Sequence, residues 1–496
     1  MSNNAPICVW FEEAVDCPDM SKNSEVHTVV VSDIHLADTE PPHPKNPLWK
    51  KFKNPEYLVD AEFKKFLEEI QRQIAATGSS QQKIELILNG DIFDFDSVMA
   101  FPQTPLFKVS RLEKLRGLGA EEEKSRFKLK TILDHHPVWL ESLRDFLKNG
   151  HRIVFVIGNH DIEFHWPSVQ QDFIDRLGGP VSFSDWFYVS NQDTLIEHGN
   201  QYDMYCLCTN PINPLIRKHH KTYVRLPFGN LASRYMLNGM GLMNPHSEAS
   251  FIRSSLSEYL VFYYKYVVRT QPLLLWTWFW GALVTLGVTL SEGFRPANKD
   301  PLTVASRIDQ IAERSNSTAG TMWALRALHA HPVCFKPLRL MQELWLDRAA
   351  LFLFVLWVSF QFYTFVHLIF PVSILWLIIP MILLMPAFIF YARSVHSEVE
   401  QSHRSALKAA PLSAQIAKVQ RVVHGHTHLA MHAMVEGIEY LNTGTWSPAF
   451  RDVECMQPYG KKCFAWIRPK QSNRTEREAL LFEWGDRGAI LIENAG

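Results

Sequence analysis

The stretch RIVFVIGNHD, residues 152–161, decides the fold, because a run of β-branched and aromatic residues typical of a strand ends directly in a polar cluster. Two earlier stretches have the same pattern: HTVVVSDIHL at residues 27–36 and KIELILNGDIFDFD at residues 83–96. Residues 60–75 have apolar side chains at helical spacing, and residues 133–147 also favour a helix. Strands that alternate with helices predict a mainly parallel sheet in this part of the chain.

Two more polar clusters follow short apolar runs later in the chain. They are EHGN at residues 197–200 and HGHTH at residues 424–428. Because loops at the carboxyl ends of neighbouring strands converge in space, we expect all five clusters to lie close together. Their carboxylates and imidazoles suit Mn, Fe, Zn or Ni. One ion needs three or four protein ligands and the clusters offer about eight, so the sequence predicts a site for two ions.

This ordered set of motifs resembles the calcineurin-like metallophosphoesterase family. The resemblance covers roughly residues 26–205 and 415–450, and it implies an α/β fold, a four-layer α-β-β-α sandwich with a two-metal centre at the strand ends. The residues that carry it are Asp33 and His35, Gly90-Asp91, Gly158-Asn159-His160-Asp161, His198 and Gly425-His426-Thr427-His428.

The resemblance also implies a role for each of these residues. One ion would take Asp33, His35, Asp91 and His428, and the other would take Asp91, Asn159, His198 and His426, with Asp91 as the bridge. His160 would face the phosphate, as a proton donor to the leaving oxygen or as a stabiliser of its charge, and Asp161 would orient His160. The expected cofactors are two divalent metal ions, with manganese favoured and iron or zinc as alternatives.

Within that family, three motifs are similar in wording to the UDP-2,3-diacylglucosamine hydrolase branch. They are VSDIHL at residues 31–36, GDIFD at residues 90–94 and NTGTW at residues 442–446. Enzymes of that branch are peripheral membrane proteins that cleave a lipid-sugar pyrophosphate. This chain departs from the branch, which typically has Arg at the position of His160 and lacks a long insertion with apolar helices.

Three apolar stretches lie between His198 and His426. Residues 270–291 contain no Asp, Glu, Lys or Arg, and neither does the block 349–392, in which Pro371 separates two expected helices at 349–370 and 372–392. Each stretch has about 20 residues, enough to cross the roughly 30 Å hydrocarbon core of a bilayer. The alternative is a helical bundle buried within a soluble cap.

We therefore expect one metallophosphoesterase domain formed by residues 26–205 and 411–496, interrupted by a helical insertion at residues 206–410 and preceded by an extension of residues 1–25. Because ligands on both sides of the insertion must meet, an odd number of full membrane crossings is excluded. We favour two crossings by the 349–392 pair, with residues 270–291 re-entrant or interfacial. Four crossings, or insertion of all three stretches into one leaflet, are the alternatives.

Composition narrows the class of protein further. The net charge of −1 excludes a globally basic nucleic-acid binder, so no nucleic-acid partner is expected, and the 47% hydrophobic content excludes a mostly disordered chain. Seven cysteines without a CxxC pair favour reduced thiols. The acidic N-terminal residues contain no apolar run, so no secretory signal is expected. These features favour a membrane-associated protein whose catalytic domain faces the cytoplasm.

The predicted function is that of a membrane-associated dimetal phosphohydrolase, which cleaves a phosphoester or pyrophosphate by attack of a metal-bridging hydroxide. The insertion beside the active-site loops favours an amphiphilic substrate, lipid- or nucleotide-linked, with the lipid bilayer as a partner. One alternative is a phosphodiesterase or protein phosphatase that acts on soluble substrates and uses the helices as an anchor. The other is a non-enzymatic membrane scaffold.

Overall fold

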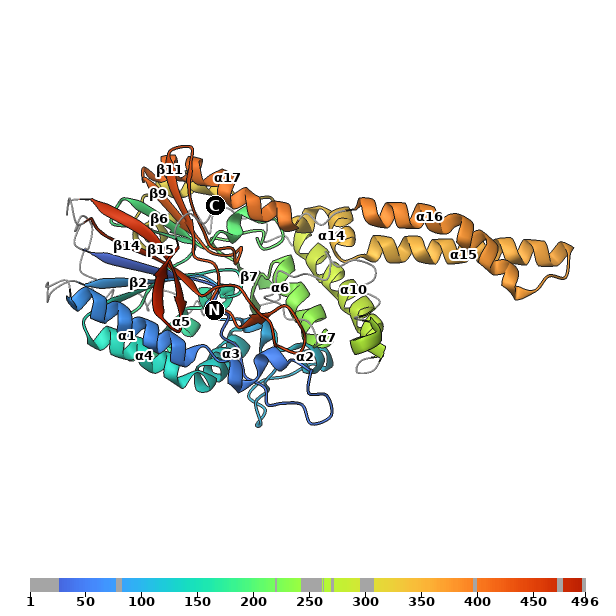
Figure 1. Cartoon of the computed structure of the whole chain (residues 1–496), viewed down its shortest axis with the longest axis horizontal. Helices are drawn as coiled ribbons and strands as arrows, with labels where there is room; N and C mark the ends of the chain where they lie inside the picture. The colour runs from blue at the N-terminus through green and yellow to red at the C-terminus, as the bar shows by residue number, and fades with distance from the viewer. Residues whose placement is uncertain are drawn as a thin grey trace, which may run out of the picture.

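The computed structural model of the chain describes residues 26–76, 83–218, 221–241, 261, 263–268, 272–294, 307–395, 399–470 and 476–492. It consists of a body of sheets and helices, from which a long helical hairpin projects (Figure 1). The extension predicted at residues 1–25 lies outside the described residues.

The first sheet has seven strands in the order β16-β15-β14-β1-β2-β3-β4. Strands β1 to β4 pair in parallel, as the alternation of strands and helices predicts, and the antiparallel strands β14 to β16 extend the sheet beyond β1. The bounds are β1 His27–Val31, β2 Ile84–Asn89, β3 Arg152–Val156, β4 Ser182–Ser184, β14 Cys463–Pro469, β15 Arg477–Gly485 and β16 Gly488–Leu491.

The second sheet has five strands in the order β10-β11-β9-β6-β5. It packs against the first sheet through fully buried aliphatic side chains, which include Val30, Ile87 and Val154 from one sheet and Ile196 and Val423 from the other. The bounds are β5 Phe187–Ser190, β6 Thr194–Glu197, β9 Arg421–His424, β10 Met431–Val435 and β11 Ile438–Asn442.

Helices cover the outer face of each sheet, which completes a four-layer α-β-β-α sandwich. The first sheet is covered by α1 (Asp60–Ala76), α3 (Glu122–His135), α4 (Pro137–Lys148) and α5 (Pro167–Leu177), and the second by α12 (Ile308–Arg314), α13 (Ala319–Arg326) and α17 (Val399–Ala417). The last three helices belong mainly to the predicted insertion, so part of that segment serves as the fourth layer of the sandwich.

One expected helix differs in the structure. Residues 133–147 do not form a single helix, because α3 ends at His135 and α4 begins at Pro137. Proline has no backbone N–H to donate to the preceding turn, and it is well suited to the first position of a new helix. The proline therefore ends one helix and starts the next.

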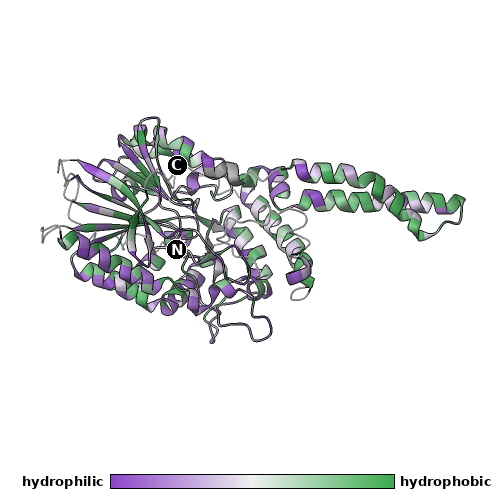
Figure 2. Ribbon diagram, in the orientation of Figure 1, coloured by the Kyte–Doolittle hydropathy of each residue, from purple (hydrophilic) through white to green (hydrophobic). Residues whose placement is uncertain are grey.

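The three apolar stretches form helices α10 (Leu274–Gly293), α15 (Leu346–Ile369) and α16 (Ile378–Ser394), the last preceded by the 3-10 turn η11 (Ile374–Leu377). All three spans are long and apolar enough to cross a membrane. Helices α15 and α16 pack side by side as the projecting hairpin, which is hydrophobic along most of its length (Figure 2). The hairpin reverses at Pro371, where the sequence predicts the break.

Shorter elements connect these layers. The segment α6 (Phe228–Ala232), η6 (Ser233–Leu237) and α7 (Asn238–Met240) packs against α10. The others are α2 (Arg111–Arg116), α14 (Pro337–Glu343), the strand pairs β7 (Leu215–Lys218) with β8 (Lys221–Val224) and β12 (Ala449–Phe450) with β13 (Pro458–Tyr459), the π-helical turn η8 (Tyr263–Val267), and the 3-10 turns η1 (Lys51–Lys53), η2 (Pro55–Tyr57), η3 (Phe95–Ser97), η4 (Ile162–His165), η5 (Asn200–Tyr202) and η10 (Val333–Phe335).

Candidate metal centre

Five of the predicted ligands occupy an uncommon backbone conformation just after strands β1, β2 and β9. Asp33, His35, Asp91, His426 and His428 have φ angles between 53° and 67°. L-residues seldom adopt this left-handed region, and each such residue costs about 1–3 kcal/mol unless its surroundings hold it there. The shared conformation is what sharp turns into a common site require.

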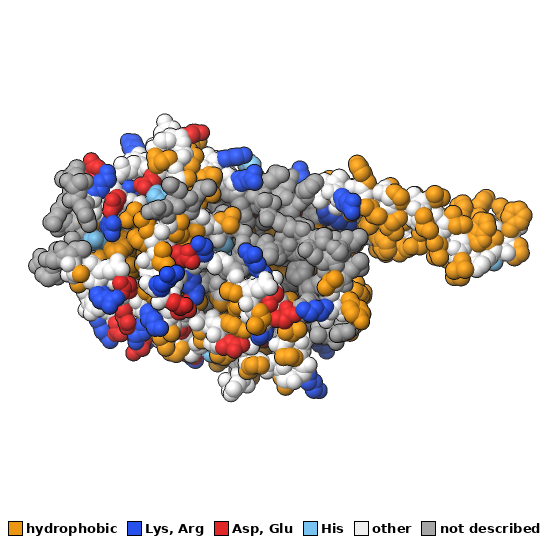
Figure 3. Space-filling model, in the orientation of Figure 1, with side chains coloured by type: hydrophobic (Ala, Val, Ile, Leu, Met, Phe, Trp, Pro, Cys, Tyr) orange, Lys and Arg blue, Asp and Glu red, His pale blue; other side chains and the backbone are white. Residues whose placement is uncertain are grey.

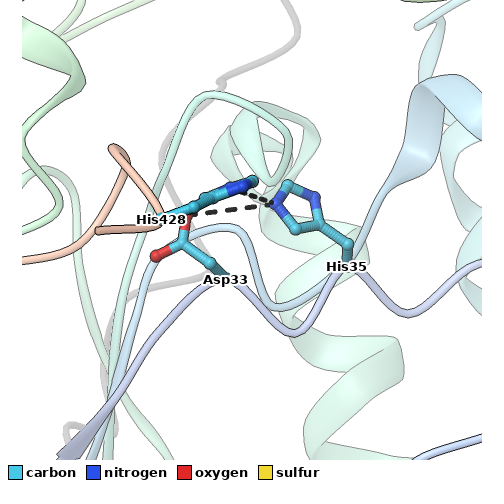
Figure 4. A group of neighbouring side chains, drawn as sticks. All are labelled: Asp33, His35 and His428. Atoms are coloured by element: carbon cyan, nitrogen blue, oxygen red, sulfur yellow. Dashed lines mark hydrogen bonds and ion pairs between the residues drawn. The ribbon is translucent and has the colours of Figure 1, made fainter. Parts of the chain in front are cut away.

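Asp33, His35 and His428 form the first compact group (Figure 4). Nε2 of His428 lies 3.2 Å from Oδ1 of Asp33 and 3.2 Å from Nε2 of His35. The side chains of Asp33 and His35 are 0% and 1% exposed. Two imidazole nitrogens and a carboxylate oxygen that converge in an enclosed site suit a divalent ion.

Asp91, His198 and His426 form the second group. Nε2 of His198 lies 3.1 Å from Oδ2 of Asp91. Nδ1 of His198 lies 2.9 Å from the carbonyl oxygen of Asn89, a contact that holds the ring with Nε2 toward Asp91. The ring centroids of His198 and His426 are 5.3 Å apart.

Asp91 connects the two groups, because it also clusters with His35 and His160. Burial alone would raise the pKa of Asp91, but the imidazoles of His198, His160 and His35 outweigh burial and hold that pKa well below its usual value. Asp91 is therefore an ionised carboxylate in the protein interior, which suits a group shared by two cations.

Asn159 supplies a separate indication that the residues of this site fit a cation. The residue is 1% exposed, and among the described residues none donates a hydrogen bond to its Oδ1. A buried polar atom without a partner costs about 1–3 kcal/mol, and such atoms call for an unseen water or ion. The neighbouring backbone N–H of His160 donates to Oδ1 of Asp91 at 2.8 Å, which keeps Asn159 beside the Asp91 carboxylate.

The seven predicted ligands fit a two-ion centre, because their donor atoms suit divalent ions, their side chains are largely buried, and Oδ1 of Asn159 has no hydrogen-bond donor among the described residues. Asp33, His35 and His428 lie in one group, and Asp91, His198 and His426 in the other. The assignment of each ligand to a particular ion stays a prediction. Two divalent ions held there would activate water at neutral pH and neutralise the charge of a phosphate.

His160 has different partners from those the resemblance implies. Its Nδ1 lies 3.3 Å from Oδ1 of Asp94 and 3.8 Å from Oδ2 of Asp96, and both carboxylates are buried. Burial lowers the pKa of His160, but Asp91, Asp94 and Asp96 outweigh burial and raise that pKa to about 10. The His160 side chain is 13% exposed, so the ring can reach a ligand that enters the site.

Asp161 does not orient the His160 ring, contrary to the prediction. Its carboxylate accepts hydrogen bonds from the backbone N–H groups of Phe93 at 2.7 Å, Ile92 at 3.1 Å and Gly158 at 3.4 Å. Asp161 therefore joins the loop after β3 to the loop after β2, and it positions backbone rather than the imidazole. The reason is local: Asp161 directly precedes the turn η4 and its carboxylate is occupied by backbone N–H groups, whereas Asp94 lies in the loop after the neighbouring strand β2.

Asp203 is a site residue that the sequence reasoning did not single out. Its Oδ2 lies 3.2 Å from Nε2 of His426, and its Oδ1 accepts a hydrogen bond from the backbone N–H of Tyr205 at 2.8 Å. The Asp203 side chain is 2% exposed. The available signal is its place five residues after His198, in the same post-strand cluster.

Asn230 is a second residue that the sequence did not reveal. This fully buried side chain on α6 donates through Nδ2 to Oδ2 of Asp96 at 2.5 Å and to the carbonyl oxygen of Asn159 at 2.8 Å. Asn238 on α7 donates to the carbonyl oxygen of Asp96 at 2.7 Å. The segment α6-η6-α7 thus contacts the metal-ligand loops on one side and the apolar helix α10 on the other.

Two glycines of the motifs are required by close approach. A Cβ atom on Gly158 would lie 2.4 Å from Oδ1 of Asp91, and a Cβ atom on Gly425 would lie 2.6 Å from Oδ2 of Asp33. Any side chain at either position would displace a carboxylate of the centre. The glycines therefore let the loops pack directly onto the ligands.

A comparison with protein families agrees with this geometry. Residues 26–229 match the family model described as calcineurin-like phosphoesterase, and this range includes the predicted ligands from Asp33 to His198. No curated protein sequence matches the chain significantly. His426 and His428 lie beyond the matched range, and the fold brings them to the same centre. The match to the calcineurin-like phosphoesterase model, together with the clustered candidate ligands, indicates a metal-dependent phosphoester hydrolase.

Proposed function

We propose that this protein is a dimetal phosphohydrolase that works at a membrane surface on an amphiphilic phosphoester or pyrophosphate. In this proposal Asp33, His35, Asp91, Asn159, His198, His426 and His428 hold the two ions, with manganese favoured. His160 faces the phosphate and stabilises the charge that develops on its oxygens during in-line displacement. Asp94 and Asp96 hold His160 in place.

The helical hairpin supports the membrane part of the proposal. Residues 349–392 contain no Asp, Glu, Lys or Arg, and large apolar side chains such as Phe365, Leu383 and Phe390 are 64%, 73% and 77% exposed. Figure 3 shows hydrophobic side chains over most of the hairpin. Helix α15 is about 36 Å long at 1.5 Å per residue, which exceeds the roughly 30 Å hydrocarbon core. Water is a poor solvent for such a surface, and a bilayer is a good one.

Polar residues gather where the hairpin leaves the body. Asp347 and Arg348 lie at the start of α15 and Arg393 near the end of α16. The Tyr391 hydroxyl donates to Asp347 at 2.8 Å, and the Arg348 guanidinium donates to the carbonyl oxygen of Val395 at 2.9 Å. This polar base suits the headgroup region, and it brings both ends of the hairpin back to one side.

Helix α10 suits an interfacial position. One face, with Gly281, Ala282 and Thr285, is buried against η6, whereas Trp276 and Trp280 on other faces are 58% and 47% exposed. In Figure 1 α10 runs steeply across the direction of the hairpin, at its base. If the hairpin crosses the bilayer, α10 lies near the membrane plane, where tryptophan side chains are favoured. This arrangement favours two crossings by α15 and α16.

One observation carries the choice of an amphiphilic substrate. Asn230 contacts the loop of Asn159 directly, and the helix that bears Asn230 packs on α10. Helix α6 therefore lies between the metal centre and α10, the helix that we place in the headgroup region. This connection favours a lipid headgroup as the substrate, and the similarity in wording to the UDP-2,3-diacylglucosamine hydrolase branch supports a pyrophosphate-linked lipid.

The orientation toward the cytoplasm is also part of the proposal. Among the described residues all five cysteines are free, and no disulfide forms between them. Unpaired buried thiols are typical of a reducing compartment.

The test compares turnover of detergent-solubilised lipid pyrophosphates with turnover of water-soluble phosphodiesters, at matched concentration and with added manganese. We expect a higher kcat/KM for the lipid set, and no turnover of either set by Asp91→Ala. Equal or better turnover of the soluble set removes the lipid substrate and leaves a soluble-substrate enzyme with an anchor. Failure of the wild type to bind metal and to cleave either set favours the scaffold alternative.

A further inference from the structure

The segment that follows the Asp94–Asp96 loop has an uneven charge pattern. Residues 97–120 contain four cations and a single acid, Glu113, and the acidic run Glu121–Glu123 follows them. Among the cations, Lys108, Arg111 and Lys114 are exposed. We call residues 101–116 the basic edge.

Glu113 does not neutralise the outer surface of the basic edge. It is 8% exposed and points inward, where it accepts hydrogen bonds from the backbone N–H groups of Ser110 at 2.8 Å and Gly119 at 2.9 Å. The Lys124 ammonium is its ion-pair partner. The charge of Glu113 is thus compensated inside the protein, and the exposed cations have no acid of their own segment beside them.

Large apolar side chains are interspersed with these cations. Leu106, Leu112 and Leu115 are 66%, 42% and 64% exposed, and Phe101 is 36% exposed. Water-exposed leucines beside lysine and arginine on a short helix are typical of segments that lie on a membrane surface, where apolar groups enter the acyl boundary and cations meet anionic headgroups.

The basic edge belongs to the part of the body that bears α10. Helix α2 packs against η6 and α7, and the same two elements pack against α10 (Figure 1). The contacts are specific: the Arg234 guanidinium donates to the carbonyl oxygen of Gly117 at 3.1 Å, and Asn238 donates to that of Arg116 at 3.3 Å. The basic edge and α10 therefore pack on the same two elements, η6 and α7.

We propose that the basic edge docks on anionic lipid headgroups when the hairpin is inserted. The inference rests on the proposed membrane function and adds a second contact, made by the catalytic domain itself. A hairpin alone would leave the body free to rotate about the bilayer normal and to tilt. A second contact next to the Asp94–Asp96 loop fixes that tilt and turns the metal centre toward the headgroups.

The test uses the full chain on phosphatidylcholine vesicles with and without phosphatidylglycerol. Flotation with the neutral vesicles tests the hairpin. Hydrogen exchange of the backbone amides in residues 101–116 then tests the basic edge. We expect slower exchange on the anionic vesicles than on the neutral ones, and loss of the difference at high salt, because headgroup attraction is screened.

The variant K108E/R111E/K114E should remove this protection. Each cation near an anionic surface is worth about fivefold in binding, so loss of the three positive charges alone should weaken binding roughly a hundredfold, and the added negative charges should weaken it further. The matched control K65E/K130E/K148E makes the same change of charge at exposed positions on α1, α3 and α4 and should keep the protection. L106S/L115S, which keeps every charge, should weaken it as well.

The outcomes separate the two proposals. If the wild type does not float with neutral vesicles, the membrane part of the proposed function fails. If it floats but residues 101–116 exchange equally on both kinds of vesicle, the basic edge has no lipid role. Equal or stronger protection by a double-stranded oligonucleotide in place of the anionic vesicles would assign the edge to nucleic acid and overturn the lipid assignment.

Discussion

Oδ2 of Asp203 lies 3.2 Å from Nε2 of His426, and the two side chains are 2% and 7% exposed. In the tautomer with the proton on Nε2, His426 donates to this carboxylate and keeps the lone pair of Nδ1 for a metal ion. Outer partners of this kind fix the tautomer and the orientation of a ligating histidine. The pair thus links a predicted ligand to a residue outside the predicted set.

Removing this carboxylate should weaken one of the two metal sites. We expect Asp203→Ala to bind metal about 10–100-fold more weakly at the site of His426, since that is the usual effect of losing such a partner. Metal content after dialysis and calorimetric titration measure the effect independently of activity. Asp203→Asn keeps an acceptor oxygen, so its metal affinity should lie between that of Asp203→Ala and that of the wild type. Unchanged affinity in Asp203→Ala would show that the contact is only structural.

Asp91→Ala should remove both metal binding and hydrolysis. Asp91 contacts His198 directly and clusters with His35, so its loss damages both groups at once. Metal analysis and turnover of a generic phosphodiester give the two readouts. Asp172→Ala is the control, because Asp172 pairs with Arg126 on the exposed surface and should behave as wild type. Retention of full metal content by Asp91→Ala contradicts the bridging role.

Asn230→Ala should lower both stability and turnover. The side chain is fully buried, and its loss leaves Asp96 and the carbonyl oxygen of Asn159 without a donor, at a cost of about 1–3 kcal/mol in the free energy of unfolding. Because Asp96 contacts His160, kcat should fall more than KM rises. Denaturant unfolding and steady-state kinetics measure the two effects. The control Asn149→Ala, at an exposed position, should change neither stability nor turnover. A normal kcat in Asn230→Ala would show that α6 does not position the site.

His329 should make stability depend on pH. Burial lowers the pKa of His329 from 6.5 to about 4, which outweighs the opposing effect of Glu197. The unfolded chain therefore takes up a proton at higher pH than the folded protein does, so stability is full above pH 6.5 and falls as the pH drops toward 4. Denaturant midpoints across this range measure the slope. His329→Gln should make the slope shallower, whereas His331→Gln, at an exposed position, should leave it as in wild type.

Deleting the hairpin should separate membrane attachment from catalysis. The Arg348 guanidinium already contacts the carbonyl oxygen of Val395, so a short Gly-Ser linker can replace residues 349–392 without strain. We expect this protein to lose flotation with vesicles and turnover of lipid pyrophosphates, and to keep its kcat on soluble phosphodiesters. Undiminished turnover of the lipid substrates would mean that the hairpin does not deliver them.

Much of the fold and of the centre could be predicted because the signals are local. Each motif follows a strand, so Asp33, His35 and Asp91 can be recognised in the sequence as part of a polar cluster after a β-branched run. Pro371 predicts the turn of the hairpin in the same way, since proline acts on the residues next to it. The single helix expected at residues 133–147 was wrong because the apolar pattern continues across Pro137 while the backbone hydrogen bonds do not.

The remaining features depend on contacts between residues far apart in the chain. Asp203 is 223 residues from His426, and Asn230 is 134 residues from Asp96, so no spacing pattern reveals either pair. The replacement of Asp161 by Asp94 as the partner of His160 depends on how two neighbouring loops pack, which a motif does not encode.

By itself, then, the sequence determined the strand-end motifs, the class of chemistry and the charge-free hairpin, because these follow from local periodicity and from residue type. Only the tertiary structure decided which carboxylates hold His160 and His426, which face of α10 is buried, and that α12, α13 and α17 complete the sandwich. These contacts join residues that are far apart in the sequence. Several carboxylates of the same type are present in the chain, and which of them meets a given histidine depends on how the loops and helices pack.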